Sequence, residues 1–284
     1  MNYNVVNDYS CLRKQLQEIL ETWGDDIRND DVESFYYLFK ERLKYLESFK
    51  LYRYNRANIH NIRNFEKQAI YLSENGNFND VYEGLPSSQL QELTSKDLNL
   101  LNDAASITCF SETYDNLLMW SHYADSHKGF CVEYDLKLLN HKDDVLKHIF
   151  PIVYQKQRTI KADIQSIIEQ IAELDQAIIQ DSDYNADYLN CLLPMFVTKG
   201  VDWEYEKEWR VIYTKLEKYQ KYMNISNVPF ECITGIYLGH RIDSLIKEII
   251  LESAERLSKE VNHNISVYES RLSNTEYKLN FIKI

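Results

Sequence analysis

The segment SITCFSETYDNLLMWSHYADSHKGFCVEYD, residues 106–135, decides the fold class of this chain. Both of its ends are short runs rich in β-branched and aromatic residues, a composition typical of strands. Between them, Asp115 or Asn116 is suited to cap a short helix over residues 117–124, and Gly129 interrupts the chain before the second run. The segment therefore predicts a strand, a short helix and a second strand.

Further short apolar runs bounded by polar residues lie on both sides of this segment. With only 7 glycines and 4 prolines to interrupt them, helices and strands are expected to be well formed. Several predicted strands follow each other with no crossover helix between them. We therefore predict an α+β fold with a mixed, largely antiparallel sheet and surrounding helices. The predicted strands are residues 50–54, 69–73, 106–112, 129–135, 150–154, 209–213, 235–239, 265–270 and 277–284.

Apolar residues at helical spacing predict helices near the N-terminus and in a long insert. Ser10 is a suitable N-cap for the first helix, and a second covers residues 31–48. We divide the chain into an N-terminal helical segment, residues 1–49, and an α+β domain, residues 50–284, with a helical insert at residues 158–190.

Charge and cysteine usage narrow the class of protein. Lys and Arg number 32 against 44 Asp and Glu, a net charge of −12, which repels phosphate backbones and argues against non-specific nucleic-acid binding. The five cysteines are scattered and include no C-x-x-C, so reduced thiols in a cytosol are expected. The N-terminus lacks the pattern of a signal peptide, and no run approaches the length of a membrane span. We expect a cytoplasmic protein.

Several phrases of the chain together resemble one known family. It is the bacterial domain-of-unknown-function family 2971, and the resemblance runs from about Lys50 to the C-terminus. The loop at residues 79–83 lacks the proline that the family carries, which predicts a less rigid loop. The resemblance implies no established activity, and its bacterial character suits a phage-defence or toxin–antitoxin cassette. The phrases are LYRY (51–54), IYLSENGNFND (70–80), CFSETYDNLLMWSHYADSHKGFCVEYD (109–135), KGVDWEYEKEWRVIY (199–213) and GIYLG (235–239).

The stretch EYEKEWR, residues 204–210, concentrates three glutamates beside one arginine. As a strand, it places all three carboxylates and Arg210 on one face, where the carboxylates repel each other and need a cation. As a helical turn that enters a strand, it makes an i,i+4 pair of Glu206 and Arg210. The sequence alone leaves both interpretations open.

A Glu-x-Glu at the start of a strand is similar to that of ADP-ribosyltransferases. In those enzymes the second glutamate holds the ribose of NAD and stabilises the oxocarbenium-like state, so Glu208 is the predicted catalytic carboxylate, with Glu206 beside it. Similar enzymes carry an arginine on an early strand and a serine on the next, and Arg53 and Ser73 stand in that order. We predict that Arg53 holds the diphosphate of NAD, the substrate, and that Ser73 orients the glutamate.

Other polar residues are candidates for binding the substrate. Trp120 is expected in the core, with His122 facing the cleft, although a packed histidine is the plainer interpretation. His122 and His127 are five residues apart and do not share a helix face, so no metal site is predicted. The asparagine and aspartate at positions 79 and 80 are equally typical of a turn. The predicted substrate-binding residues are His122, Tyr123, Asn79, Asp80 and Arg210.

Two other functions stay open. Asp80, Glu83 and the Glu-x-Glu, with Lys199, are an acidic set of the kind used by metal-dependent nucleases or phosphodiesterases. A non-catalytic sensor or partner-binding module would use the same surface without chemistry. The expected partner is a nucleotide or another small-molecule ligand, or a protein in the last case, and not a membrane.

Overall fold

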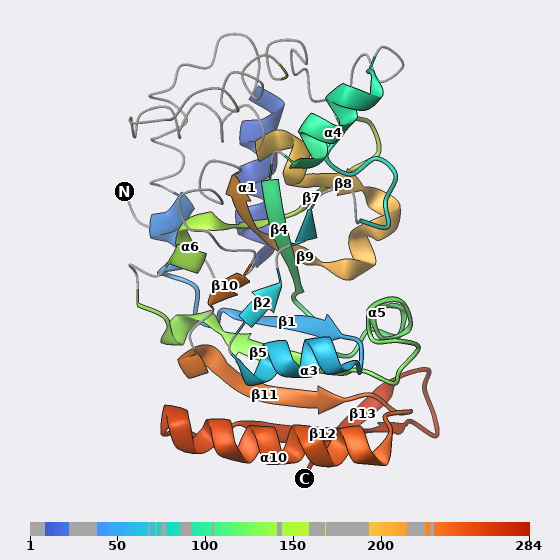
Figure 1. Cartoon of the computed structure of the whole chain (residues 1–284). Helices are drawn as coiled ribbons and strands as arrows, with labels where there is room; N and C mark the ends of the chain where they lie inside the picture. The colour runs from blue at the N-terminus through green and yellow to red at the C-terminus, as the bar shows by residue number, and fades with distance from the viewer. Residues whose placement is uncertain are drawn as a thin grey trace.

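Strand pairing in the computed structural model confirms the predicted α+β class (Figure 1). Within the part of the chain that the structure describes, nine strands form one sheet in the order β13-β12-β11-β5-β1-β4-β9-β6, with β3 beside β4. Every pair in this sheet is antiparallel except β11 and β12, which are parallel because helix α10 returns the chain between them. The described residues are 9–22, 39–67, 69–71, 73–74, 78–85, 93–103, 105–140, 144–158, 168, 193–214, 225–227 and 230–284.

The strands and helices lie close to the predicted positions. Residues 31–38 of the second predicted N-terminal helix lie outside the described residues; residues 39–43 are helical, and the helix ends there and not at residue 48. Of the predicted helical insert, only Arg158 and Ile168 are described. The strands of the main sheet are β1 (Lys50–Asn55), β3 (Ser73–Glu74), β4 (Ala105–Ser111), β5 (Phe130–Asp135), β6 (Ile149–Pro151), β9 (Glu208–Thr214), β11 (Ile233–Leu238), β12 (Ser266–Leu272) and β13 (Leu279–Lys283). The helices are α1 (Tyr9–Thr22), α3 (Ile59–Glu66), α4 (Ser95–Asp103), α5 (Leu117–Tyr123), α6 (Asp144–His148) and α10 (Ser244–Val261).

The strand predicted over residues 150–154 is in fact two strands. Pro151 lies opposite Trp209, and the N–H of Ile152 still donates to the carbonyl of Glu208 at 2.9 Å, so the missing N–H of Pro151 faces away from β9. The N–H of Val153 donates instead to the carbonyl of Val197 at 2.8 Å. The chain then leaves the main sheet and pairs elsewhere. The additional strands form two small sheets, β7 (Val153–Gln155) with β8 (Thr198–Gly200), and β2 (Ala69–Tyr71) with β10 (Ile225–Asn227).

The main sheet opens between β1 and β4. These two strands share a single registered pair, Tyr52 with Ser111, whereas β4 and β9 pair along their whole length. Beyond that pair, β4 runs across the direction of β1 (Figure 1). Side chains of both strands therefore face a space that no ladder fills.

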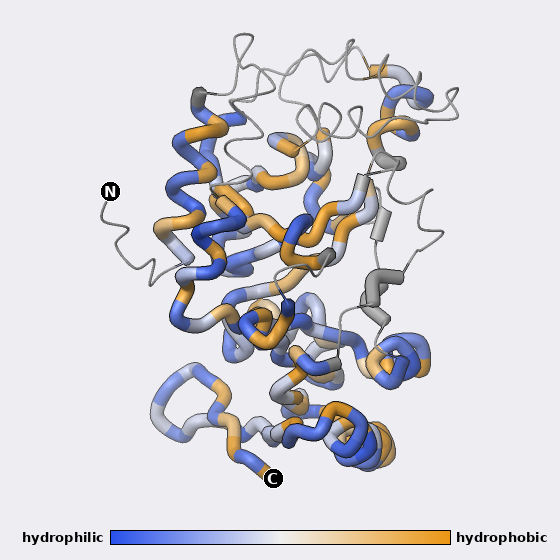
Figure 2. The backbone as a smooth tube through the Cα atoms, turned by 90° about the vertical axis from the view of Figure 1, so that its left-hand side faces the viewer, coloured by the Kyte–Doolittle hydropathy of each residue, from blue (hydrophilic) through white to orange (hydrophobic). Residues whose placement is uncertain are grey.

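One apolar core joins α1 to the sheet. Leu12 and Leu16 of α1 are fully buried in the same cluster as Phe49 and Trp209. Leu12, Leu16 and Leu20 of α1 are four residues apart and buried, so they form one apolar face of an amphipathic helix. Polar residues lie between them along the chain (Figure 2). No helix among the described residues has the length and apolar character needed to cross a membrane.

A second, smaller cluster holds α5 against β1. Trp120 is fully buried, as predicted, and its indole N–H donates to the carbonyl of Tyr114 at 2.7 Å. Its ring meets Tyr54 edge-on at 5.3 Å between centroids. The turn after α5 then brings Gly129 so close to β1 that a Cβ there would lie 2.0 Å from the carbonyl oxygen of Asn55. Only glycine fits this approach, which fixes α5 beside the opening in the sheet.

We expect Trp120→Ala to lower the free energy of unfolding by about 3–5 kcal/mol, because the truncation leaves a cavity in a packed cluster and an unpaired carbonyl. Chemical denaturation measures this change. The matched control is Leu118→Ala on the same helix, whose side chain is 48% exposed and should have little effect. Equal changes for the two variants would contradict the packing described for α5.

Candidate functional site

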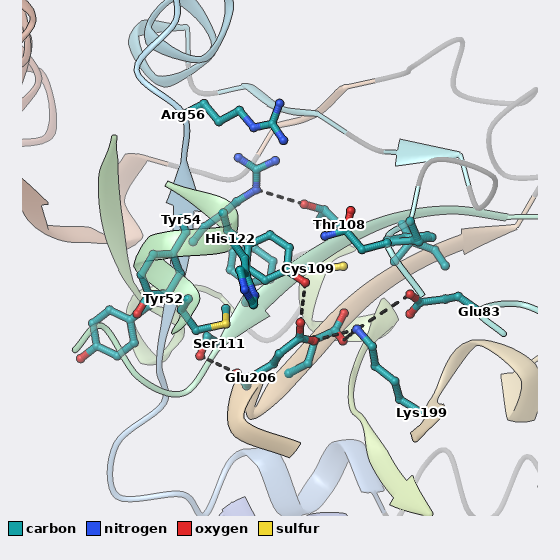
Figure 3. A pocket seen from close by; sticks show the side chains of 18 residues that line it. Tyr52, Tyr54, Arg56, Glu83, Thr108, Cys109, Ser111, His122, Lys199 and Glu206 are labelled. Carbon is teal, nitrogen blue, oxygen red and sulfur yellow. Dashed lines mark hydrogen bonds and ion pairs between the residues drawn. The ribbon is translucent and has the colours of Figure 1, made fainter. Parts of the chain in front are cut away.

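A pocket of about 260 Å³ lies where β1 and β4 separate (Figure 3). The two strands supply opposite walls, α5 closes one end, and the loop at residues 78–83 together with β8 and the start of β9 closes the other. The residues that bring chemistry to it are Arg53, Arg56, His122, Tyr123, Lys199, Glu206 and Glu208.

Two arginines mark one side of the pocket. The Nε of Arg53 donates to the Thr108 hydroxyl at 3.3 Å, and its guanidinium also donates to the side chain of Asn55. Arg56 is exposed and lies on the opposite side of the pocket from Glu206 and Lys199 (Figure 3). Neither arginine forms an ion pair among the contacts of the described residues. This side of the pocket is therefore suited to an anionic group.

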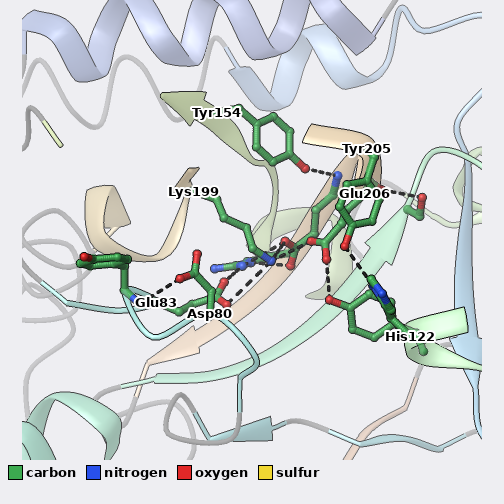
Figure 4. A network of polar contacts seen from close by, with 12 residues as sticks. Asp80, Glu83, His122, Tyr154, Lys199, Tyr205 and Glu206 are labelled. Carbon is green, nitrogen blue, oxygen red and sulfur yellow. Dashed lines mark hydrogen bonds and ion pairs between the residues drawn. The ribbon is translucent and has the colours of Figure 1, made fainter. Parts of the chain in front are cut away.

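The opposite side is a buried ionic cluster (Figure 4). The ammonium Nζ of Lys199 lies 2.7 Å from Glu206, 3.2 Å from Glu208 and 3.8 Å from Glu83. Arg210 donates to both oxygens of Glu208, at 2.7 and 3.0 Å, and also contacts Glu83. We call these five residues the ionic cluster. Each of the five side chains is at most 5% exposed.

Local backbone geometry brings the two glutamates of the Glu-x-Glu together. The 3₁₀ helix η3 (Val201–Glu206) ends at Glu206, and Lys207 adopts a left-handed conformation with φ of 45° before β9 begins. The hydroxyl of Ser111 donates to the carbonyl of Glu206 at 2.7 Å, and the N–H of Glu208 donates to the hydroxyl of Tyr154 at 2.7 Å. Both carboxylates thus point at Lys199, which β8 supplies.

The ionic cluster carries one more negative than positive charge, because three carboxylates meet two cations. Burial raises the pKa of Glu208 to about 7; the charge of Lys199 works against this rise and that of Glu206 adds to it. Burial lowers the pKa of Lys199, but the charges of Glu208 and Glu206 outweigh it, so that the net pKa is raised. Below neutral pH, Glu208 is therefore the carboxyl group of the cluster that we expect to be protonated.

Tyr123 and His122 of α5 each contact a residue of η3. The hydroxyl of Tyr123 donates to Glu206, and burial followed by the charge of Glu206 raises the pKa of this tyrosine, which keeps its proton. The Nδ1 of His122 lies 3.1 Å from the hydroxyl of Tyr205, and the imidazole is exposed (Figure 4). His122 faces the pocket, as expected, and is open to solvent.

Of the nine predicted site residues, six line this one pocket. They are Arg53, Asn79, His122, Tyr123, Glu206 and Glu208. Asp80 lines the adjoining pocket and accepts from the N–H of Tyr82 at 2.9 Å, as a turn residue does. Arg210 is fully buried behind Glu208. Ser73 lies on β3 and pairs with Ile107 of β4, and its side chain lies outside what the structure describes. The chemical roles of all nine stay predictions.

The structure supports the second interpretation of residues 204–210, a helical turn that enters a strand. The 3₁₀ helix η3 ends at Glu206 and β9 begins at Glu208, and Glu204 is exposed. The ion pair expected with that turn was wrong, since Glu206 pairs with Lys199 and not with Arg210. Glu208 is 4% exposed and pairs with Lys199 of β8 and with Arg210 of β9.

Sequence reasoning missed the central position of Lys199. Its proximity in sequence to the Glu-x-Glu was visible, but β8 belongs to a small sheet that the sequence did not predict. Glu83 was recognised only as part of a loop or metal set, and the structure places it on Lys199 and Arg210. Cys109 and Ser111 of β4 also line the pocket, and the apolar pattern of their strand gave no sign of this.

A family model described as a protein of unknown function (DUF2971) matches residues 119–211. The predicted resemblance is confirmed over these residues, which include most of α5, all of β5, Lys199, Glu206 and Glu208. Comparisons with curated proteins and with solved structures found no match.

The raised pKa of Glu208 predicts how stability depends on pH. Between the ordinary value of 4.5 and about 7, the folded protein holds this proton more tightly than the unfolded chain does, so the contribution of Glu208 to stability falls as pH rises. Glu208→Gln removes the titration. The stability of the wild-type protein relative to this variant should therefore decrease from pH 4.5 to 7 and level off above.

Denaturant titrations at each pH measure the difference. Glu204→Gln, which removes an exposed carboxyl from the same stretch, should show no such trend. If the stability of wild type relative to Glu208→Gln increased with pH, folding would stabilise the ionised carboxylate. That result would contradict the effect of burial described above.

Proposed function

We propose that this chain, which resembles DUF2971 over residues 119–211, binds NAD in this pocket and transfers its ADP-ribosyl group to an acceptor. One observation carries the proposal. Arg53 from β1 and the carboxylates Glu206 and Glu208 line the same pocket, at the opening of the sheet. A cationic group and a carboxylate pair in one cleft match the two needs of this chemistry, an anchor for a diphosphate and a counter-charge for a cationic sugar.

The reaction breaks the bond between C1′ of the ribose and the nicotinamide nitrogen. Nicotinamide leaves as a neutral molecule, and positive charge develops on the ribose as in glycoside hydrolysis. Glu208 supplies the negative charge that stabilises it, and Glu206, which holds the proton donor Tyr123, lies beside it. An acceptor nucleophile then bonds to C1′, and its proton is released to solvent.

The diphosphate is assigned to the arginines. Arg53 is held by Thr108 and Asn55, so its guanidinium is oriented in advance, and Arg56 offers a second cation at the exposed mouth. The pocket volume of about 260 Å³ lies just below the ~300–1,000 Å³ of typical ligand pockets. It therefore suits the nicotinamide riboside part, with the adenosine part extending past the arginines.

Ser111 is a further candidate, besides Ser73, for the residue that orients the glutamate. It lies on β4 in register between Tyr52 and Glu208, and its hydroxyl holds the carbonyl of Glu206. This contact fixes the end of η3 and with it the Glu206 side chain. Ser111 acts on the glutamate through the backbone and need not touch NAD.

The ionic cluster also bears on the alternative of a metal-dependent nuclease. Lys199 and Arg210 occupy the space between Glu83, Glu206 and Glu208, where a divalent cation would have to lie. Among the described residues, no three His, Cys, Asp or Glu side chains are grouped so as to hold a metal ion. Internal cations are thus the partners of these carboxylates, which counts against a divalent cation at this position.

Thermal melting with added NAD, with added Mn²⁺ and with neither separates the functions, because a ligand that binds only the folded protein raises its melting temperature. We expect NAD to raise it, and Arg53→Met to abolish the rise. A rise with Mn²⁺ alone would favour the nuclease. No change with either would favour a protein-binding module and contradict the proposal.

We expect Glu208→Gln to slow nicotinamide release from NAD by about 10²–10³-fold, the loss typical for removing one group that stabilises transition-state charge. The amide keeps the shape of the side chain but not its charge. Release of nicotinamide is followed by chromatography, with circular dichroism to check folding. Glu204→Gln is the matched control and should keep the wild-type rate. Equal rates for the two variants would remove Glu208 from the catalytic role.

A further inference from the structure

The Lys199 ammonium occupies a cradle built from four side chains. Glu83, Glu206 and Glu208 surround it at 3.8, 2.7 and 3.2 Å, and the ring of Trp203 lies 4.7 Å away as a cation–π partner. Glu206 and Trp203 come from η3, Glu208 from β9 and Glu83 from the loop before α4. Such an enclosure is specific for a small cation that donates several hydrogen bonds.

Lys199 and Arg210 contact different sets of carboxylates. Arg210 contacts Glu83 and Glu208 from inside the core, and it makes no contact with Glu206. Lys199 contacts all three carboxylates and lines both the NAD pocket and the adjoining cavity of about 520 Å³. It is therefore the cation that stands between the two glutamates of the catalytic pair and faces the ligand space.

Two neighbouring buried carboxylates do not both ionise without a cation, because burial and mutual repulsion favour a shared proton. Stabilising a cationic sugar requires the opposite state, with the negative charge present before the reaction. The cation that keeps the pair ionised must itself stay protonated in the interior. Lys199 meets this need, since the surrounding carboxylates hold its proton.

We propose that Lys199 is a positioning residue, whose ammonium fills a cation subsite formed by Glu83, Glu206, Glu208 and Trp203 and stabilises the ionised form of Glu208 against burial. The role in turnover rests on the proposed function, whereas the subsite itself does not. Lys199 does not contact the sugar in this role; it acts through the two carboxylates. The subsite accepts a primary ammonium ion, so removal of the lysine side chain creates a binding site for a free alkylamine.

The first test uses this last consequence and needs no NAD. In Lys199→Ala, n-propylammonium replaces the missing atoms from Cγ to Nζ. We expect it to raise the melting temperature of this variant saturably at pH 8, with no such rise for wild type. Tetramethylammonium, which donates no hydrogen bond, should have no effect. Lys156→Ala, which removes an exposed lysine that lines only the adjoining cavity, is the matched control. A folded Lys199→Ala that gains nothing from n-propylammonium overturns the subsite.

The second test addresses ionisation directly. Titration of ¹³C-labelled glutamate carboxyls by NMR should show the pair taking up a proton about 1–3 pH units higher in Lys199→Gln than in wild type, the shift expected when a cation within about 4–6 Å is removed. Glutamine still donates to Glu206 and serves where the alanine variant does not fold. Unchanged carboxyl titration in Lys199→Gln contradicts the proposal.

The third test separates this role from a purely structural one. The acid limb of the pH profile for nicotinamide release should move to higher pH by the same interval in Lys199→Gln, with activity recovering at alkaline pH. Lys156→Gln should keep the wild-type profile. If Lys199→Gln lowered the rate of nicotinamide release by the same factor at every pH, Lys199 would only support the fold. Absence of NAD turnover in wild type, together with rescue by n-propylammonium, would reject the transferase and leave the subsite in place.

Discussion

Pairing of three buried carboxylates with Lys199 and Arg210 is the constraint on which the rest of this structure depends. The five side chains come from the loop before α4, from β8, from η3 and from β9, so their ion pairs tie a small sheet and two irregular segments to the main sheet. Removing one partner from such a buried pair costs about 3–5 kcal/mol, because a charge is left uncompensated in the interior. These segments must therefore dock together.

The position of this cluster follows from how the sheet is built. β1 and β4 share one registered pair and then separate, which leaves side chains of both strands around a pocket instead of in a ladder. The arginines of β1 and the following turn face the carboxylates across this opening. The pocket therefore has one positive and one negative side, a separation of charge that matches a ligand with an anionic diphosphate and a sugar that becomes cationic.

Much of the fold was predictable because its signals are local. Apolar runs gave β1, β4, β5 and β11, and Gly129 marked the turn that precedes β5. The split of residues 150–154 was missed, because it depends on Val153 pairing with the distant segment 197–198 in place of β9. The convergence of Arg53, His122 and Glu208 was expected from their order along the chain, but the burial of Glu208 was not.

The amino-acid sequence by itself determined the fold class, the order of the strands along the chain and the residue types available for chemistry, since these depend on neighbours a few positions apart. Only the tertiary structure decided which charges meet. Lys199 lies seven residues from Glu206 and more than a hundred from Glu83, yet one ammonium group contacts both. Electrostatic pairing acts through space and in a low dielectric. Arg210 is only two residues from Glu208, but the contacts of Lys199 with Glu83, Glu206 and Glu208, and with them the pKa of Glu208, depend on how β8, η3 and β9 pack.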